Sequence, residues 1–159
     1  MNDVSLDAAR ESATLVALLQ TEYGVIYGLG AVGGQLAVRV PGSGPNPAPI
    51  VAIATDTYDQ HRLRRDRLIA ALRSRQASVP VPLAAYQVTR SDQPAVLANY
   101  LAGLAQTTIV AYRSALASLA DVALRTDAVA AVIEAAKVRT SALRTAGRSD
   151  VDAAPALPG

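Results

Sequence analysis

The stretch ASVPVPLAAYQVTRSD, residues 77–92, decides how the rest of the chain can be arranged. The prolines of VPVP push the residue before each of them toward β or polyproline geometry, so the stretch is predicted to be extended rather than helical. Fully extended it reaches ~50 Å, which exceeds the ~39 Å length of the helix predicted before it. This connection can therefore run the whole length of a helical bundle.

Two helices are predicted before this connection, from apolar residues that recur at three- and four-residue steps. The first runs from about residue 6 to residue 40, and the second from about residue 50 to residue 76. PGSGPNPAP, residues 41–49, separates them because prolines and glycines cannot continue a helix, and so short a link makes an antiparallel hairpin. The interior positions expected are Leu15, Leu19, Glu22, Ile26 and Leu29 in the first helix, and Val51, Ala54, Tyr58, His61, Arg65, Leu68 and Leu72 in the second.

Two further helices are predicted after the connection, again as an antiparallel hairpin. The third runs from about residue 93 to the early 120s, and Asp92 is expected to be its N-cap. Thr126 or Asp127 is expected to cap the fourth helix, and Gly147 to stop it. The interior positions expected are Leu97, Leu101, Leu104, Thr108, Ala111 and Ala115 in the third helix, and Val129, Ile133, Ala136, Thr140 and Leu143 in the fourth.

The composition favours one all-α domain. A chain of 159 residues fits a single domain, since domains cluster around ~100–150 residues. Alanine and leucine lead the helix-propensity ranking, and the absence of Trp and Phe leaves Leu, Val, Ile, Ala and Tyr to form the core. We therefore expect an antiparallel four-helix bundle over residues 1–146 and a flexible C-terminal tail over residues 147–159.

The composition also excludes several classes of protein and site. The absence of cysteine excludes disulfides, iron–sulfur clusters, a cysteine nucleophile and cysteine zinc sites. The N-terminus lacks a signal-peptide pattern, and the longest uncharged run, residues 23–38, is shorter than the ~20 residues that span a bilayer. A net charge of +2 disfavours nucleic acid as a partner. We expect a cytoplasmic protein with no membrane partner.

Two stretches carry a resemblance to a known family. EYGVIYGLGAVGGQL (22–36) resembles that family's acidic-aromatic-glycine stretch, and YDQHRLRRDRL (58–68) resembles its His-Arg-x-Arg-Arg-Asp stretch. Over about residues 8–146 the chain resembles the ferritin-like superfamily, and it is most similar to the small actinobacterial ferritin-like proteins of family DUF4439. The resemblance implies a ferritin-like four-helix bundle with the long crossover between its second and third helices.

The chain lacks most of the metal ligands of the di-iron members of that superfamily. Those members need one Glu from each of two helices and a Glu-x-x-His pair from each of the other two. Glu22 matches the first Glu, and His61 stands where a histidine belongs. Tyr58 stands three residues before His61 where an acid is required, and Lys137 follows Glu134 where the second histidine belongs. We expect no metal and no cofactor.

One buried polar layer is predicted near the middle of the bundle, made by Glu22, Tyr58, His61 and Arg65 together with Thr108. A buried carboxylate needs a partner, and Arg65 or His61 is the candidate partner of Glu22. We favour a hydrogen-bonded network that fixes helix register, and the alternative is a ligand or catalytic pocket. No nucleophile or oxyanion hole accompanies these residues, so no catalytic residue is assigned.

The arginines of the second helix allow two interpretations. Arg62 can pair with Asp59 and with Asp66 along a solvated helix face, at three- and four-residue spacing, and we favour this interpretation. Alternatively, the arginines bind phosphates or an acidic partner. The residues concerned are Arg62, Arg64, Arg67, Arg73 and Arg75.

Together these features predict a metal-free structural or protein-interaction module rather than an enzyme. The glycines of the first helix favour close helix approach, inside the bundle or between two subunits, so a homodimer is expected, with an unidentified protein as a further partner. The alternative is a small-ligand-binding or catalytic bundle that uses Glu22, His61 and Arg65.

Overall fold

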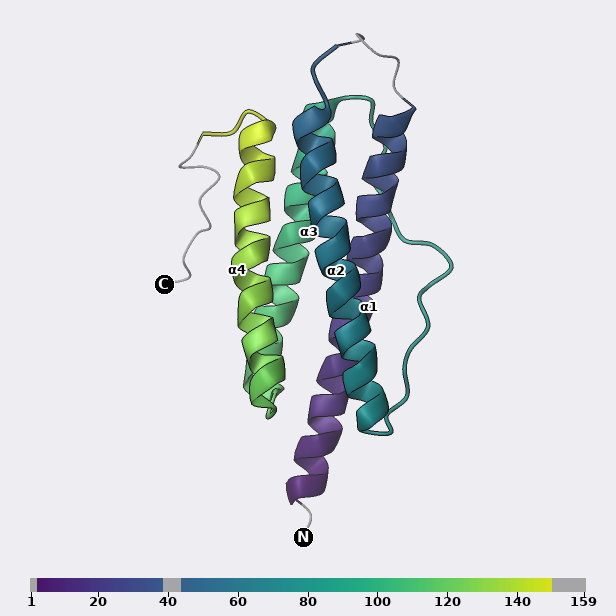
Figure 1. Ribbon diagram of the computed structural model, residues 1–159, viewed down its shortest axis with the longest axis vertical. Helices are drawn as coiled ribbons and strands as arrows, with labels where there is room; N and C mark the ends of the chain where they lie inside the picture. Colours follow the sequence, from purple (N-terminus) through teal and green to yellow (C-terminus); the bar gives the residue numbers. More distant parts are fainter. Residues whose placement is uncertain (1–2, 39–43, 150–159) are drawn as a thin grey trace.

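The computed structural model describes residues 3–38 and 44–149, and these residues form four long helices. They are α1 (Asp3–Ala37), α2 (Ala48–Ser74), α3 (Pro94–Ala115) and α4 (Val122–Thr145), with one 3-10 turn, η1 (Leu116–Ser118), between the last two. No strand occurs within these residues, and the predicted all-α fold is confirmed (Figure 1). The predicted tail lies largely outside the described residues and stays a prediction.

The helices form two antiparallel hairpins, α1 with α2 and α3 with α4, as predicted (Figure 1). Residues 75–93 run outside the bundle along α1 and return the chain to the end where α2 begins, so α3 runs parallel to α2 (Figure 1). The hairpins are joined more extensively between α1 and α3 than between α2 and α4. The space between α2 and α4 is therefore the less tightly packed side of the bundle.

The long connection is fastened to α1 by hydrogen bonds from side chains to backbone. The Tyr23 hydroxyl donates to the carbonyl oxygen of Pro80 at 3.1 Å. Gln35 donates from Nε2 to the carbonyl oxygen of Thr89 at 3.0 Å and accepts from the backbone N–H of Ser91 at 3.0 Å. Because an extended segment outside a sheet cannot pair its own backbone groups, these contacts give it a defined course.

The fourth helix begins earlier than the sequence pattern predicted. Its N-cap is Asp121, whose carboxylate accepts from the backbone N–H groups of Ala123 at 2.8 Å and Leu124 at 3.2 Å. The prediction of Thr126 or Asp127 as the cap is wrong, because the Asp121 carboxylate, nearer the start of the chain, already satisfies free N–H groups of the helix start.

Three other helix ends can be compared with the predictions. The N-cap of α3 is Gln93 rather than Asp92, and its side chain makes no capping hydrogen bond. The third helix also ends at Ala115, before the predicted boundary in the early 120s. Gly147 has a φ of +83°, which is the left-handed conformation expected of a glycine that stops a helix.

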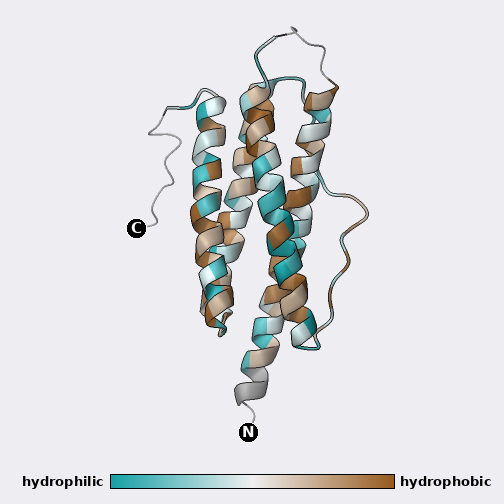
Figure 2. Cartoon of the chain, viewed as in Figure 1, coloured by the Kyte–Doolittle hydropathy of each residue, from teal (hydrophilic) through white to brown (hydrophobic). Residues whose placement is uncertain are grey.

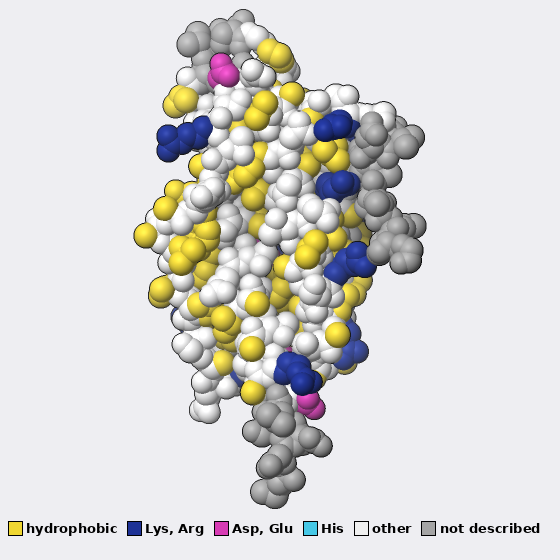
Figure 3. Space-filling view, turned by 180° about the vertical axis from the view of Figure 1, so that it is seen from behind, with side chains coloured by type: hydrophobic (Ala, Val, Ile, Leu, Met, Phe, Trp, Pro, Cys, Tyr) yellow, Lys and Arg dark blue, Asp and Glu magenta, His cyan; other side chains and the backbone are white. Residues whose placement is uncertain are grey.

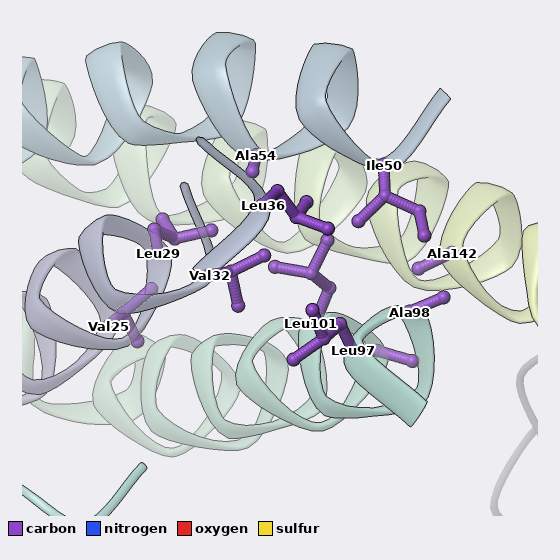
Figure 4. Close-up of a cluster of buried hydrophobic side chains, with 11 residues drawn as sticks. Val25, Leu29, Val32, Leu36, Ile50, Ala54, Leu97, Ala98, Leu101 and Ala142 are labelled. Atoms are coloured by element: carbon purple, nitrogen blue, oxygen red, sulfur yellow. The ribbon is translucent and has the colours of Figure 1, made fainter. Parts of the chain in front are cut away.

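The buried apolar side chains form two larger clusters, and the polar layer separates them. One cluster contains Val25, Leu29, Val32, Leu36, Ile50, Ala54, Leu97, Ala98, Leu101, Ala102 and Ala142 (Figure 4). The other contains Leu15, Leu18, Leu19, Leu68, Leu72, Tyr112, Ala115, Leu119, Ala128 and Ala131. Glu22 on α1 and His61 on α2 fall between these clusters in sequence, and the middle of α2 is mostly hydrophilic (Figure 2).

The inward face of α4 differs from the prediction. Val129 and Ile133 were expected inside, but they are 44% and 51% exposed. The residues that α4 buries are instead Ala128, Ala131, Ala135 and Ala142. Small side chains let α4 approach α3 closely, and the helix is turned so that its branched side chains point outward. Val51 of α2, also expected inside, is 39% exposed.

Close approach explains one glycine of α1. A Cβ atom on Gly28 would lie 2.7 Å from the hydroxyl of Tyr100 and 2.9 Å from Cδ1 of Leu104 on α3, so no larger residue fits without a shift. A Cβ atom on Gly33 or Gly34 would meet nothing within 4 Å. The predicted role of the glycines inside the bundle therefore holds for Gly28 and not for those two.

Two helical stretches, Asp7–Ala37 and Pro94–Ser118, are long and apolar enough to cross a membrane by length and composition. The most apolar window of each is 44% buried inside the bundle, and the core helix of a soluble protein meets the same criterion. Their apolar residues supply much of the two core clusters. The predicted cytoplasmic localisation stays a prediction.

Candidate functional site

Glu22 is the centre of a polar cluster in the middle of the bundle. Its side chain is fully buried, and both carboxylate oxygens are paired. Oε2 accepts a hydrogen bond from Nδ1 of His61 on α2 at 2.6 Å, and Oε1 accepts one from the hydroxyl of Tyr112 on α3 at 2.6 Å. An unpaired carboxylate at this depth would cost several kcal/mol, so the two donors are what permit its burial.

Tyr112 is a donor that the sequence analysis missed. Burial raises the pKa of Tyr112, and the neighbouring Glu22 carboxylate raises it further, so the phenol keeps its proton and donates. A signal for it was present, because Tyr112 follows the inward-facing Thr108 by four residues and so lies on the same helix face.

The hydrogen bond to Glu22 fixes the tautomer of His61. A carboxylate can only accept, so Nδ1 carries a proton, and Nε2 is the nitrogen left on the opposite side of the ring. Nη1 of Arg64 lies 3.5 Å from Nε2. Because a guanidinium can only donate, Nε2 acts as an acceptor toward it. His61, which is 2% exposed, thus lies between Glu22 on one side of its ring and Arg64 on the other.

Arg64 links the cluster to α4. Its side chain, 12% exposed, forms an ion pair and hydrogen bond with Glu134, whose side chain is 47% exposed. Arg64 was expected on a solvated face, and that expectation is wrong. It follows His61 by three residues, so the two side chains lie on one side of α2, and this spacing was visible in the sequence.

The structure separates Tyr58 and Arg65 from Glu22 and His61, which corrects the predicted polar layer. Arg65 pairs with the neighbouring Asp66 at 2.8 Å, and Arg62 lies over the Tyr58 ring at 5.8 Å from its centroid. Tyr58 and Arg65 instead line an open groove beside the long connection. The buried face of α2 follows Thr57, His61 and Leu68, so α2 is turned relative to the predicted stripe.

His61 and Arg64 line a pocket between α2 and α4 with a volume of about 270 Å³. The buried residues of its wall are Thr57, His61, Ala105 and Ala135. The exposed residues at its rim are Asp56, Gln60, Glu134 and Lys137. Because Nδ1 of His61 is turned to Glu22, Nε2 is the ring nitrogen available to the pocket. The wall is apolar apart from this nitrogen, the Thr57 hydroxyl and the guanidinium of Arg64.

The residues present do not fit a di-iron centre. Both oxygens of Glu22 already accept hydrogen bonds, and Glu134 is paired with Arg64, whose positive charge would lie against a bound cation. Across residues 3–38 and 44–149, no three His, Cys, Asp or Glu side chains lie together in a way that could hold a metal ion. The cluster offers hydrogen-bonding and ion-pairing groups rather than a coordination shell.

A second buried carboxylate, Glu11, lies near the other end of α1 and was not singled out from the sequence. Oε1 accepts from the backbone N–H groups of Ala120 at 2.8 Å and Asp121 at 3.0 Å, and Oε2 accepts from Nε and Nη2 of Arg75 at 3.1 and 3.0 Å. Burial alone would raise the pKa of Glu11, but these hydrogen bonds and the charge of Arg75 outweigh it and lower the pKa. Glu11 thus joins α1 to the end of α2 and to the start of α4.

Comparisons with known proteins place the fold but name no activity. A family model described as a domain of unknown function (DUF4439) matches residues 14–159. The crystal structure of a conserved hypothetical protein, rv2844, from Mycobacterium tuberculosis is similar, with a TM-score of 0.74 and 26% sequence identity over 90% of this chain and 94% of that chain. No curated protein matches. The matched residues include every member of the Glu22 cluster.

Proposed function

The chain belongs to the DUF4439 family, and we propose that it is a small-ligand-binding bundle whose site is the pocket between α2 and α4. The observation that carries the proposal is the hydrogen bond between His61 and Glu22, which orients an imidazole that lines the pocket. Packed apolar residues of similar volume could fill the same space with little loss of stability, so stability alone does not require this network. An oriented imidazole beside a cavity is the arrangement typical of a binding site.

We also propose that the bundle that carries this site is a metal-free ferritin-like bundle. The long connection between α2 and α3 and the parallel course of these helices support that assignment. Glu22, His61 and Glu134 come from three different helices around the middle of the bundle, as the ligands of a ferritin-like centre do. Arg64 then supplies, as a fixed positive charge, what a metal ion supplies elsewhere.

The groups around the pocket are suited to binding rather than to turnover. Nε2 of His61 can accept a hydrogen bond from a ligand, Arg64 can pair with an anion, and the alanines of the wall can contact apolar atoms. The possible nucleophiles among the pocket residues are the Thr57 hydroxyl and the Lys137 amine, and within the described residues neither is hydrogen-bonded to His61.

The single histidine of the chain makes this proposal testable by NMR. Protein labelled with ¹⁵N at histidine gives one pair of ring-nitrogen signals, which report on Nδ1 and Nε2 of His61. We expect the Nε2 signal to move when isobutyrate, isobutyramide or isobutanol is added at millimolar concentration.

A pocket-filling variant supplies the control. Ala135→Leu places a larger side chain in the pocket wall and should abolish the response. Ala111→Leu enlarges a half-buried alanine that lines a different pocket, on α3, and should retain it. Ring signals that none of the three probes moves would contradict the proposal.

The second candidate function is a structural or interaction module that forms a homodimer. The exposed face of α4 favours it, because Val122, Val129 and Ile133 are 74%, 44% and 51% exposed at helical spacing. Hydrophobic side chains also form small groups on the face seen in Figure 3, where basic side chains follow one edge. Light scattering at micromolar concentration would exclude a stable dimer if it found only a 16.4 kDa particle.

A further inference from the structure

We infer that the pocket takes a small 2-hydroxy acid, whose hydroxyl donates to Nε2 of His61 and whose carboxylate pairs with Arg64. The inference rests on the proposed function and adds the chemical class of the ligand. Three features of the pocket carry it: an underused acceptor, a cation already holding a carboxylate, and the short distance between the two.

The underused acceptor is Nε2 of His61. Within the described part of the chain its hydrogen-bond partner is Nη1 of Arg64 at 3.5 Å, which is beyond the ~2.7–3.2 Å range of a good N–H donor bond. The ring is 2% exposed, so bulk water does not fully compensate. A buried acceptor without a close donor is unfavourable, and a ligand hydroxyl supplies that donor with ordinary geometry.

The cation is Arg64, and its present partner shows what it binds. Glu134 lies at the rim of the pocket, and its carboxylate pairs with the Arg64 guanidinium. The Glu134 side chain is 47% exposed, whereas the Arg64 side chain is 12% exposed. Glu134 can therefore turn out to water while Arg64 stays in place, at the cost of their ion pair. A ligand carboxylate would then take over the position of the Glu134 carboxylate, with the planar geometry that guanidinium favours.

Nη1 of Arg64 lies 3.5 Å from Nε2, and Glu134 binds the neighbouring Nη2 of the same guanidinium, so the two polar groups of the ligand must lie close together. A hydroxyl and a carboxylate on adjacent carbon atoms can reach both nitrogens, whereas a simple acid or a simple alcohol satisfies only one. The rest of the ligand would contact Ala105, Ala135 and Val138. A volume of about 270 Å³ lies just below the ~300–1,000 Å³ of sites for drug-sized ligands, so the ligand is a small acid.

Calorimetry with three matched compounds tests the ligand class. Leucic acid carries both groups, isocaproic acid lacks the hydroxyl, and leucic acid amide lacks the charge. We expect leucic acid to bind about tenfold more tightly than isocaproic acid, which loses the neutral hydrogen bond to Nε2 of His61. We expect it to bind about 10–100-fold more tightly than the amide, which loses the charge-assisted hydrogen bonds to Arg64.

A charge variant separates a ligand role of Arg64 from a merely structural one. Glu134→Gln removes the competing carboxylate and should raise the affinity for leucic acid about tenfold, an increase that loss of a structural ion pair would not produce. Asp127→Asn is the matched control. It removes one charge from another pair between α2 and α4, Arg67 with Asp127 at 3.2 Å, outside this pocket, and should leave the affinity unchanged.

The outcomes distinguish the ligand class from the proposed function. If all three compounds bound equally and Ala135→Leu abolished their binding, the 2-hydroxy-acid inference would be overturned and the pocket would remain a binding site. Equal binding of the two acids would overturn the role of Nε2 alone. If none of the three compounds binds or moves the His61 ring signals, the inference and the proposed function both fail.

Discussion

Two buried glutamates on one face of α1 have different roles. Glu11 and Glu22 lie about three helical turns apart, and both are buried, with 7% and 0% of their surfaces exposed. The carboxylate oxygens of Glu11 accept hydrogen bonds from two backbone N–H groups and from Arg75. Glu22 has two side-chain donors, Tyr112 and His61, and the second of these continues to a pocket.

The difference shows what separates a structural polar contact from a candidate site. The hydrogen bonds of Glu11 end on a guanidinium and on the turn before α4, so they join three parts of the chain and lead no further. Those of Glu22 pass through an imidazole, whose two nitrogens can serve two different partners at once. Both carboxylates are buried, and the chemistry of their donors makes the distinction.

The largest expected effect comes from breaking the Glu22 cluster. Glu22→Leu leaves the Tyr112 hydroxyl and Nδ1 of His61 buried without an acceptor, and should lower the free energy of unfolding by about 3–5 kcal/mol in urea denaturation. Leucine has a similar size, so the loss reports the unpaired groups rather than a cavity.

A compensated variant sharpens this test. Glu22→Leu combined with His61→Leu and Tyr112→Phe removes the whole network, and should recover most of the lost stability. Recovery would show that the cluster is not needed for folding, as expected of a binding site. If the triple variant remained as unstable as the single one, the cluster would be structural in the same sense as Glu11.

The Glu11 contacts should give an intermediate effect. Glu11→Gln turns an amide N–H₂ toward donors and should cost about 2 kcal/mol at neutral pH. The folded-state pKa of Glu11 is below its ordinary value of 4.5, so its stabilisation is present above that value and is lost as the pH falls through the folded pKa. Urea denaturation in acid should therefore show the gap between variant and parent closing, and a constant gap would contradict the assignment.

The smallest effect is expected from Tyr112→Phe, which removes one hydrogen bond to Glu22 and should cost about 1 kcal/mol. Burial raises the pKa of Tyr112 above its ordinary value of 10.0. The contribution of the phenol is therefore complete below pH 10 and declines above it, where the unfolded chain releases a proton that the folded chain retains. Thermal denaturation in alkali should show the parent losing its advantage over Tyr112→Phe, whereas a widening difference would disprove the shift.

Particular residues show why the site was only partly predictable. The spacing pattern identified Glu22 and His61 as inward-facing, because both continue an apolar stripe. The same pattern included Tyr58 and Arg65 and left out Arg64, since positions one residue apart differ by only about 100° and both lie near the edge of the stripe. Which edge turns inward depends on the neighbouring helices. The rotation was hardest to predict for α4, because its alanines are only weakly apolar and do not distinguish one face of the helix from another.

By itself the sequence determined the helical fold, the proline-rich breaks on either side of the second helix and the course of the long connection. These follow from local causes: apolar spacing, prolines that exclude helix, and the reach of an extended segment. Only the tertiary structure decided how far each helix is rotated about its own axis. That rotation determines that Tyr112, Arg64 and Glu134, and not Tyr58 and Arg65, join Glu22 and His61 in the cluster. Rotation is set by packing against partners distant in sequence, such as the close fit of the α4 alanines to α3, and no single helix encodes it.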